Sequence, residues 1–462
     1  MTRPHVVVVG AYGSAGVAAA EVLADADVEL TLVDDGDPGG GLCILRGCMP
    51  SKEVLSAAAH RYQTRHDHRL TGDPPAVDLD AVVETKDDHV LGFAEHRRAA
   101  VHDLAERENV TFHHETAEFV DDCVLDVGGE RVDADYVVVA TGSDLNVPDL
   151  PGLGDVDWMG SRDVLDATDF PDSGVVMGFG YVGLELVPYL SEAAGMDITV
   201  IEHDDRPLDD YHRSFGEELL DMYREEFGVD VRTEVYEERV EPTTDGGVRL
   251  HLEDGTTAEG DQLFLFTGRR PSYPDGLDAT SLDPWPDWVQ GTLQSVDDER
   301  VFVVGDANGE RMLLHNAKEE GYLAGRNVLH SEVGEELERY DPLPHKVLFS
   351  GTGVYPFASL GLTAPEAREV GRDVVTAQRD ATDDGVFKTK DAPRGTARLV
   401  VDADDGTVLG YHGLHYHADV MAKTMQVVLE AGMDVREIPD RAYHPTTPEI
   451  LDGLFRETAD QL

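Results

Sequence analysis

The sequence contains little cysteine: three residues in 462, namely the pair Cys43 and Cys48 and the isolated Cys123. A chain of this length buries a hydrophobic core without covalent cross-links, so the scarcity of cysteine excludes a small scaffold held together by disulfides. A structural zinc site does not fit the pair either, because it needs four ligands, and His60, the next histidine, has no second cysteine pair behind it. A redox pair remains, although Cys-x4-Cys spacing alone is also compatible with coincidence.

Basic residues are scarce as well. The chain has 37 Lys and Arg against 93 Asp and Glu, a formal net charge of −56, and lysine is rare beside arginine. This charge argues against nucleic acid and anionic membranes as partners. Because 41% of the residues are hydrophobic, the acidic residues cover an ordinary core and the chain is expected to fold. Such a surface is typical of a protein kept soluble in concentrated salt, so we expect a halophilic archaeal protein.

Long apolar runs are missing too. No run of 18 apolar residues occurs, so no transmembrane helix is predicted. A predicted strand at residues 6–9 begins almost at the N-terminus and leaves no room for the apolar region of a secretion signal. We therefore expect a cytoplasmic protein without a membrane partner.

The first 35 residues predict a strand–helix–strand unit of the kind that binds a dinucleotide. The turn after the first strand contains Gly10, Gly13, Ser14 and Gly16. Glycines let the backbone approach a pyrophosphate at the helix N-terminus, and Asp34, at the end of the second strand, can bind ribose hydroxyls. Because the glycine spacing is one residue longer than G-x-G, an ordinary strand-to-helix turn stays open as an alternative.

A second unit follows the strand at 175–177, where Gly178, Gly180 and Gly183 give a full G-x-G-x-x-G. Two such units imply two dinucleotides. The following strand ends at Glu202, whose carboxylate suits a free ribose 2′-hydroxyl and repels a 2′-phosphate, which favours NADH. Three basic residues close in sequence keep NADPH open; they are His203, Arg206 and Arg213.

Strands that run into glycine turns at 140–143, 267–271 and 301–306 indicate the domain organisation. We predict an α/β fold with two Rossmann-like dinucleotide-binding domains and a C-terminal α+β domain. The first nucleotide domain would comprise 1–147 and 272–335, the second 148–271, and the C-terminal domain 340–462. In the last, strands at 397–401 and 408–410 and a helix near 418–431 are expected.

Six motifs occur in one order along nearly the whole chain. They are Gly-Gly-x-Cys-x4-Cys-x-Pro-Ser-Lys at 40–52, Ala-Thr-Gly at 140–142, Gly-x-Gly-Tyr-Val-Gly-Leu-Glu at 178–185, Gly-Arg-x-Pro at 268–271, Gly-Asp-Ala at 305–307 and His-Pro-Thr-x-x-Glu at 444–449. Together they resemble the FAD-dependent pyridine nucleotide-disulfide oxidoreductases, such as glutathione reductase, dihydrolipoyl dehydrogenase and mercuric reductase. The resemblance implies FAD, NAD(P)H and a homodimer.

The same resemblance implies roles around the cysteine pair. Cys43 would attack the substrate disulfide as an exposed thiolate of low pKa, and Cys48 would lie against the flavin. Lys52 and Glu185 correspond to an ion pair beside flavin N5, where a fixed cation stabilises the reduced flavin. Tyr181 corresponds to the tyrosine that covers the flavin in glutathione reductases until the nicotinamide arrives.

The resemblance further implies that His444 is the general acid-base for the leaving thiol and that Glu449 orients it. These two residues would act on Cys43 of the other subunit of a two-fold dimer. The implied FAD residues are Gly10, Gly13, Ser14, Gly16, Asp34, Lys52, Thr141, Gly142, Asp306 and His315. The implied NAD(P) residues are Gly178, Gly180, Gly183, Glu202 and Gly268.

Two further features are expected to be structural. His412, His415 and His417 are close in sequence, but they fall at a strand-to-helix junction of the family's interface domain, so no metal site is expected. Cys123 is expected to be a buried hydrophobic residue in a strand.

The substrate hypothesis depends on Arg46, which lies inside the cysteine loop. Cys-Ile-Leu-Arg-Gly-Cys is similar to the Cys-Val-Ile-Arg-Gly-Cys of plant-type glutathione reductases, and an arginine there favours an anionic disulfide. Small thiol disulfides carry several carboxylates, and haloarchaea are associated with γ-glutamylcysteine. The preferred hypothesis is therefore reduction of bis-γ-glutamylcystine.

Dihydrolipoyl dehydrogenase is the alternative, because Pro50-Ser51-Lys52 has the form found in that enzyme. Mercury reduction is not expected, since the C-terminal cysteine pair of mercuric reductases is missing. NADH oxidases and transhydrogenases of the wider family lack the redox pair that this chain has. A flavin-binding scaffold without turnover would not need the complete set of implied catalytic residues.

Overall fold

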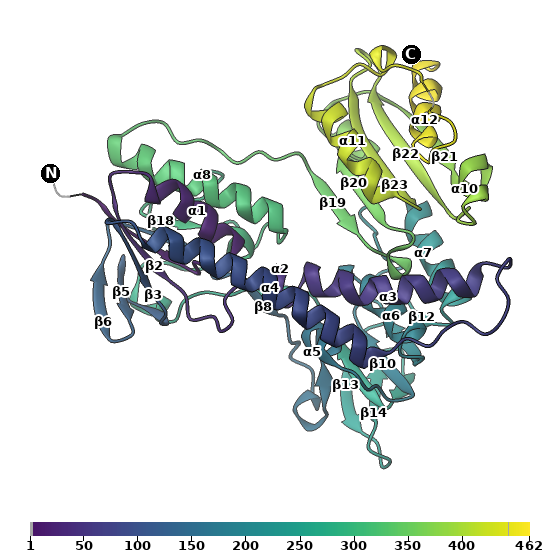
Figure 1. Cartoon of the computed structure of the whole chain (residues 1–462), viewed down its shortest axis with the longest axis horizontal. Helices are drawn as coiled ribbons and strands as arrows, with labels where there is room; N and C mark the ends of the chain where they lie inside the picture. The colour runs from purple at the N-terminus through teal and green to yellow at the C-terminus, as the bar shows by residue number, and fades with distance from the viewer. Residues whose placement is uncertain (1–2, 442) are drawn as a thin grey trace. The chain divides into compact units, whose positions relative to one another are not determined.

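The computed structural model describes residues 3–441 and 443–462, and the chain divides into two compact units (Figure 1). Unit 1 contains the residues up to Pro50, Glu84–Asn146 and Arg269–Pro342. Unit 2 contains Ser51–Val83, Val147–Gly268 and Leu343–Leu462. Each unit contains one five-stranded parallel sheet and a smaller antiparallel sheet, and unit 2 also contains a five-stranded antiparallel sheet, which confirms the predicted α/β fold class.

Unit 1 is built on a parallel sheet in the order β18-β7-β1-β2-β3. Its strands and helices are β1 (His5–Val9), α1 (Ser14–Ala24), β2 (Glu29–Val33), α2 (Leu42–Leu45), β3 (Val110–His113), β7 (Tyr136–Val139), β18 (Val301–Val303) and α8 (Leu314–Val333). Four successive valines of β1 are buried, as expected for a parallel strand covered on both faces. Figure 1 shows α8 alongside α1, and the fit is close, since a Cβ on Gly321 would overlap the carbonyl oxygen of Ala15.

Two smaller sheets complete unit 1. One is antiparallel and consists of β4 (Ala117–Asp121), β5 (Val124–Val127) and β6 (Glu130–Asp133). The other pairs β8 (Ser143–Leu145) with β17 (Arg269–Pro271). The prediction that Cys123 lies in a strand was wrong, because it occupies the tight turn between β4 and β5 with a φ of 53°. Its predicted burial is confirmed, and burial raises the pKa of its thiol to about 12.

Unit 2 contains the second parallel sheet, in the order β12-β11-β10-β16-β9. Its elements are β9 (Trp158–Met159), α5 (Ser161–Asp166), β10 (Ser173–Met177), α6 (Tyr181–Glu192), β11 (Asp197–Ile201), α7 (Arg213–Glu226), β12 (Asp230–Arg232) and β16 (Gln262–Leu265). An antiparallel sheet is added by β13 (Glu237–Pro242), β14 (Val248–Leu252) and β15 (Thr257–Gly260).

The C-terminal part of unit 2 is an antiparallel sheet in the order β19-β20-β23-β22-β21. Its elements are β19 (His345–Leu348), β20 (Phe357–Gly361), α9 (Ala364–Glu369), β21 (Val374–Asp380), α10 (Gly385–Thr389), β22 (Gly395–Asp402), β23 (Val408–His415), α11 (Ala418–Glu430) and α12 (Glu449–Ala459). The strands and the helix expected in this part correspond to β22, β23 and α11. Helices α11 and α12 pack on the sheet, as Figure 1 shows.

Two long helices have residues in both units: α3 (Cys48–His66) and α4 (Leu79–Ala105). Within unit 2, α3 contributes Val54, Leu55, Ala58 and Tyr62 to the same hydrophobic cluster as α6 and α7. Helix α3 is therefore anchored in the core of unit 2 directly after the cysteine pair.

Two of the three clustered histidines, His412 and His415, are buried in the C-terminal sheet. His412 accepts at Nδ1 from Ser359 Oγ (2.8 Å), and its Nε2 lies 3.2 Å from the carbonyl oxygen of Leu362. His415 contacts Tyr411 Oη (2.8 Å) and the carbonyl oxygen of Tyr416 (2.9 Å). Burial lowers the pKa of both rings to about 4, because it disfavours the charged form.

These two histidines should make the protein sensitive to acid. A histidine whose folded-state pKa lies below its unfolded value of 6.5 stabilises the fold above pH 6.5, and the stability is lost as the pH falls toward 4. At pH 5 each ring should cost about 2 kcal/mol. We expect the unfolding midpoint of His412→Gln/His415→Gln to depend less on pH between 7 and 5 than that of the wild type.

The matched control is the exposed His60, whose change to Gln should leave the pH dependence intact. Equal pH dependence of the wild type and the double variant in thermal unfolding would contradict the assignment.

Candidate active site

The first glycine turn joins β1 to α1 and fits a pyrophosphate. Gly10 has a φ of 92°, and a Cβ there would overlap the carbonyl oxygen of Ala140. A Cβ on Gly16 would in turn overlap the carbonyl oxygen of Gly10. Gly13 is the N-cap of α1 and offers no side-chain cap, so the backbone N–H groups of the first turn can bind an anion. The additional residue in this turn therefore leaves the close helix–strand approach intact.

Asp34 follows β2, next to this turn. Its Oδ2 accepts a hydrogen bond from the backbone N–H of Tyr12 (2.8 Å), and its Oδ1 accepts one from Gly36 N–H (2.9 Å). Burial raises the pKa of the carboxyl, and the two backbone donors oppose that effect. The carboxylate is thus fixed at the strand end, where a ribose would bind.

The second turn repeats this arrangement. Gly178 has a φ of 94°, and Gly183 approaches its carbonyl group so closely that a Cβ would lie 2.6 Å from the oxygen. Glu202 is buried, and its two oxygens accept from the backbone N–H groups of Phe179 and Asp204, both at 3.0 Å. Its pKa is raised by burial. The two turns thus share a positive φ and a close helix approach although their glycine spacings differ.

Neighbouring basic residues are paired with acids. His203 Nε2 lies 2.6 Å from Glu237 Oε2, and Arg213 binds Asp205 (2.9 Å) and Glu217 (2.6 Å). Arg206 also binds Asp205, at 2.5 Å. The cations that could have attracted a 2′-phosphate are therefore already neutralised by nearby carboxylates.

Some of the other residues implied for FAD binding are linked by hydrogen bonds around the turns that follow β7 and β18. Asp306, in the short turn after β18, accepts from Ser143 Oγ (2.6 Å), and Ser143 Oγ also accepts from Arg269 Nε (2.8 Å). Thr141 Oγ1 donates to the carbonyl oxygen of Ser272 (2.5 Å). Gly142 has a positive φ, and His315 is exposed at the start of α8. Gly268, implied for NAD(P), belongs to unit 2 and also has a positive φ.

Cys43 and Cys48 form a disulfide with a Cα–Cα distance of 4.9 Å. Cys43 lies in the short helix α2 and is half-buried, whereas Cys48 is the first residue of α3 and is exposed. Arg46, the C-cap of α2, is also exposed. A cation therefore stands in the loop that the disulfide closes.

Lys52 and Glu185 form an ion pair between α3 and α6. Lys52 Nζ lies 2.7 and 2.6 Å from the two carboxylate oxygens and 4.6 Å from the centre of the Phe349 ring. Glu185 Oε1 also accepts from the backbone N–H of Phe349 (3.0 Å). Carboxylate, ring and backbone together hold the ammonium group in one place.

His444 and Glu449 are brought together at the start of α12. His444 Nδ1 lies 3.0 and 3.2 Å from the carboxylate oxygens of Glu449, while Nε2 stays available on a ring that is 75% exposed. The backbone N–H of Thr446 also donates to Glu449 Oε1 (3.0 Å) and, as the main cause, lowers the pKa of that carboxyl. The pair has the geometry of a base held by an orienting carboxylate.

Tyr181 begins α6 and is 42% exposed, with Lys346 Nζ 5.4 Å from its ring centre. Partial burial of the Tyr181 hydroxyl and, to a lesser extent, the negative charge of Asp210 raise the pKa of this phenol to about 12.

Sequence reasoning missed two sets of residues. A cavity of about 630 Å³ beside the first turn is lined by Tyr12, Arg98, His102 and Phe112 among others, and these have no motif. Glu320 is buried in α8 and accepts from Gly305 N–H (2.7 Å) and Asn308 Nδ2 (2.8 Å), which fixes the turn that carries Asp306. Burial raises the pKa of Glu320 to about 7. The sequence around Glu320 gave no signal for this role, because its partners Gly305 and Asn308 lie 15 and 12 residues away in the chain.

Comparison with known families identifies the class of protein. The sequence pattern described as "Pyridine nucleotide-disulphide oxidoreductase" matches residues 4–321, and that of the family's dimerisation domain matches residues 352–454. The chain therefore belongs to the pyridine nucleotide-disulphide oxidoreductases. It is a flavoprotein oxidoreductase of a family that uses FAD and NAD(P)H, and it carries the family's dimerisation domain.

Individual relatives agree with this assignment. The chain is 30% identical to dihydrolipoyl dehydrogenase 2 of Haloarcula marismortui over 97% of this chain and 95% of that one. It is 27% identical to a mercuric reductase of Bacillus cereus over 94% of this chain and 68% of the relative. Relatives from Haloarcula, Halobacterium and Haloferax support the predicted halophilic character.

Solved structures share the fold. The HOCl-induced flavoprotein disulfide reductase RclA from Escherichia coli superposes with a TM-score of 0.82 at 22% identity, covering 98% of this chain and 99% of that one. LpdA from Mycobacterium tuberculosis gives 0.83 at 20% identity, covering 98% and 99%. Within the described residues, no helix is both long and apolar enough to cross a membrane.

Two glycines of the second turn allow an effect on nucleotide binding to be measured separately from an effect on folding. Gly180 has space around the position of a Cβ, with nothing within 4 Å, whereas Gly183 does not. We expect Gly180→Ala to keep the wild-type unfolding midpoint but to weaken nucleotide binding by about tenfold, or 1.4 kcal/mol, because the methyl group would meet the pyrophosphate.

Gly183→Ala should instead lower the unfolding midpoint. Thermal unfolding and a direct titration with NADH measure both effects, and unchanged NADH affinity in Gly180→Ala would show that no pyrophosphate approaches this turn.

Proposed function

We propose that this chain is an NAD(P)H:disulfide oxidoreductase that reduces a small anionic disulfide through Cys43 and Cys48. The observation that carries the proposal is the closed Cys43–Cys48 disulfide with the exposed Arg46 inside its loop. The net reaction would be NAD(P)H + H⁺ + RSSR → NAD⁺ or NADP⁺ + 2 RSH. The preferred substrate is bis-γ-glutamylcystine, which would give two molecules of γ-glutamylcysteine.

The first glycine turn and Asp34 fit FAD, and the second turn and Glu202 fit the nicotinamide nucleotide. Bound FAD would supply the two-electron transfer between nicotinamide and disulfide. Lys52, held by Glu185, would place a positive charge beside the cofactor. Tyr181 would cover the nicotinamide side until the nucleotide binds. Thr141, Gly142, Asp306, His315 and Gly268 would complete the two cofactor sites.

In the disulfide step, Cys43 would attack as the thiolate and form a mixed disulfide with one half of the substrate. His444 of the partner subunit would protonate the leaving thiolate, with Glu449 of the partner subunit keeping Nδ1 occupied so that Nε2 faces the substrate. Attack by Cys48 on the mixed disulfide would release the second thiol and restore the Cys43–Cys48 disulfide. The active protein would thus be a homodimer.

NADH is the proposed electron donor. The buried Glu202 carboxylate would bind the ribose hydroxyls and repel a 2′-phosphate. The acid partners of His203, Arg206 and Arg213 support the same preference, because they leave little positive charge for an additional phosphate. The proposed domains remain those of the sequence prediction, and the acidic composition supports a cytoplasmic location.

Dihydrolipoyl dehydrogenase is the second candidate. It is favoured by the names of several relatives, which are dihydrolipoyl dehydrogenases at 27–30% identity over nearly the whole chain. The same cysteine pair would then oxidise dihydrolipoyl groups and pass the electrons to NAD⁺. The exposed Arg46 has no evident use for the neutral lipoamide, which supports the first proposal.

The two cysteines should be distinguishable by spectroscopy. A thiolate lying against oxidised flavin gives a long-wavelength absorption band, so anaerobic reduction of the wild type with one equivalent of NADH should produce it. Cys43→Ser cannot form the disulfide and should show the band before any NADH is added, whereas Cys48→Ser should lack it, and both variants should lose disulfide turnover.

The control is Cys123→Ser, because Cys123 is buried away from any redox partner. If the native protein binds FAD but shows no band after reduction, the proposed role of Cys48 is wrong.

Arg46 should determine the preference for charged disulfides. We expect Arg46→Ala to raise the KM for bis-γ-glutamylcystine by roughly tenfold and to leave the KM for lipoamide unchanged, with Arg46→Lys between the two. Steady-state assays with both substrates and both nucleotides in concentrated KCl measure this effect. Faster wild-type turnover of lipoamide than of bis-γ-glutamylcystine would favour dihydrolipoyl dehydrogenase instead.

A further inference from the structure

Helices α3 and α6 are joined by ion pairs at two levels. Lys52 binds Glu185 near the beginning of both helices, and Arg61 and Arg65 bind Glu192 at the end of α6. Glu185 and Glu192 are two helical turns apart, so they lie on the same face of α6. Both levels therefore connect the same two helix faces.

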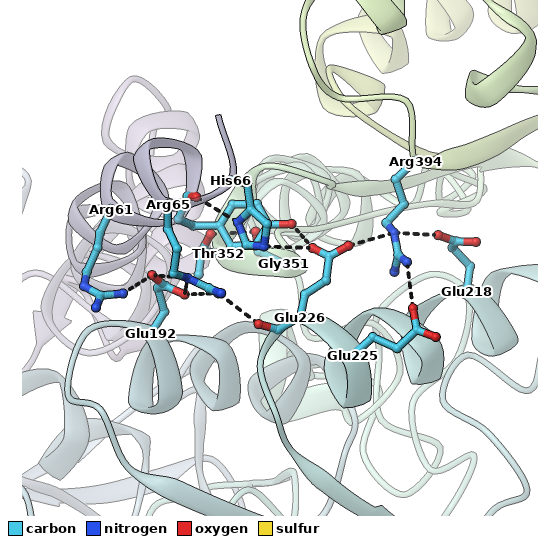
Figure 2. A network of polar contacts seen from close by, with 11 residues as sticks. Arg61, Arg65, His66, Glu192, Glu218, Glu225, Glu226, Gly351, Thr352 and Arg394 are labelled. Atoms are coloured by element: carbon cyan, nitrogen blue, oxygen red, sulfur yellow. Dashed lines mark hydrogen bonds and ion pairs between the residues drawn. The ribbon is translucent and has the colours of Figure 1, made fainter. Parts of the chain in front are cut away.

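Glu192 is the more deeply buried of the two acids, with only 2% of its side chain exposed. Arg65 Nε lies 3.2 and 3.1 Å from its two oxygens, Arg65 Nη2 lies 2.6 Å from Oε2, and Arg61 Nη1 binds Oε1 (Figure 2). A carboxylate removed from water to this extent is costly unless it is fully paired. The planar guanidinium of Arg65 donates its hydrogen bonds only in a narrow range of directions. The contact therefore fixes the orientation of the two side chains as well as pairing their charges.

Glu226 of α7 adds a second anchor for the same part of α3. The Tyr62 hydroxyl donates to Glu226 Oε2, and Arg65 Nη2 donates to the Glu226 carbonyl oxygen (2.9 Å). From the other side, Arg394 Nε lies 3.0 Å from Glu226 Oε1. Figure 2 shows these contacts as one continuous network from Arg61 to Arg394. The C-terminal half of α3 is thus held by α6 and α7 through contacts of Arg61, Tyr62 and Arg65.

The contacts of Lys52 with Glu185 and the Phe349 ring form only where α3 places the lysine, so they depend on the position of α3 against α6. Lys52 has a flexible four-carbon side chain that is 33% exposed, and pairs of this kind contribute little on their own. One residue of helix corresponds to 1.5 Å of rise and 100° of rotation, so a small displacement of α3 would move the ammonium group away from the carboxylate.

We propose that Glu192 is a positioning residue for Lys52: by binding Arg61 and Arg65 it fixes the axial position and rotation of α3 against α6. The catalytic consequence rests on the proposed function, in which Lys52 acts beside the flavin. The positioning itself concerns only the chain and can be measured separately.

The functional test compares Glu192→Gln with the wild type as FAD-loaded protein. We expect unchanged FAD content and unchanged affinity for NADH, a shifted flavin midpoint potential, and a rate of anaerobic reduction by NADH that is lower by roughly tenfold. Glu225→Gln is the matched control, because Glu225 is 69% exposed and its ion pair among the described residues is a long one, with Arg394 at 3.4 Å. Its potential and rate should equal those of the wild type.

The structural test is a double-mutant cycle with Lys52→Met, followed by thermal unfolding of the purified full-length chain. Because Lys52 and Glu192 do not touch, independent contributions would be additive. Positioning predicts that Lys52→Met lowers the unfolding midpoint less in the Glu192→Gln background. Arg65→Lys, which keeps the charge but loses the planar geometry, should reproduce the coupling if Glu192→Gln fails to fold.

Additive unfolding midpoints together with a wild-type reduction rate in Glu192→Gln would overturn the proposal. If the wild type binds no FAD or accepts no electrons from NADH, the proposed function fails, and the double-mutant cycle still decides whether Glu192 positions Lys52.

Discussion

The close backbone approach at the two glycine turns is the constraint on which the rest of the structure depends. At Gly16 and Gly183 the helix comes so near the preceding turn that no side chain fits between them, and at Gly10 and Gly178 the turn comes equally near the backbone of Ala140 and Phe266. This contact brings each helix N-terminus to the carboxyl end of its sheet and places Asp34 or Glu202 beside it. Both proposed nucleotide sites follow from that one geometry, since the anion-binding N–H groups and the ribose-binding carboxylate are set by the backbone.

The fold class and the paired side chains of the site were predictable from the sequence. Glycine turns depend on local backbone geometry, so Gly178, Gly180 and Gly183 could be recognised from their spacing alone. The pairs Lys52–Glu185 and His444–Glu449 were predictable for a different reason, namely the resemblance to a family, and the structure brings the members of each pair into contact. Which cofactor or substrate atoms these pairs meet is still a prediction.

Other features had no local signal. Glu192 is one of 93 acidic residues in the chain, and nothing in its neighbourhood separates it from a solvated surface acid. Its burial results from Arg61 and Arg65, which are more than 120 residues away in sequence. Cys123 was misplaced because it directly precedes the apolar Val124 and Leu125 and so fits the start of a strand, whereas its positive φ has no signal in the sequence. Contacts of this kind become visible only when distant segments are packed together.

The hydrogen bonds that fix Asp34 and Glu202 bear on how nucleotide preference could evolve. Each carboxylate is preorganised by two backbone N–H groups before any ligand arrives, so binding would lose little side-chain entropy at these positions. A rigid acid cannot turn aside to admit a phosphate. A lineage that changed its electron donor from NADH to NADPH would therefore have to replace Glu202 itself rather than add basic residues around it, and the replacement would leave the N–H groups of Phe179 and Asp204 in need of a new acceptor.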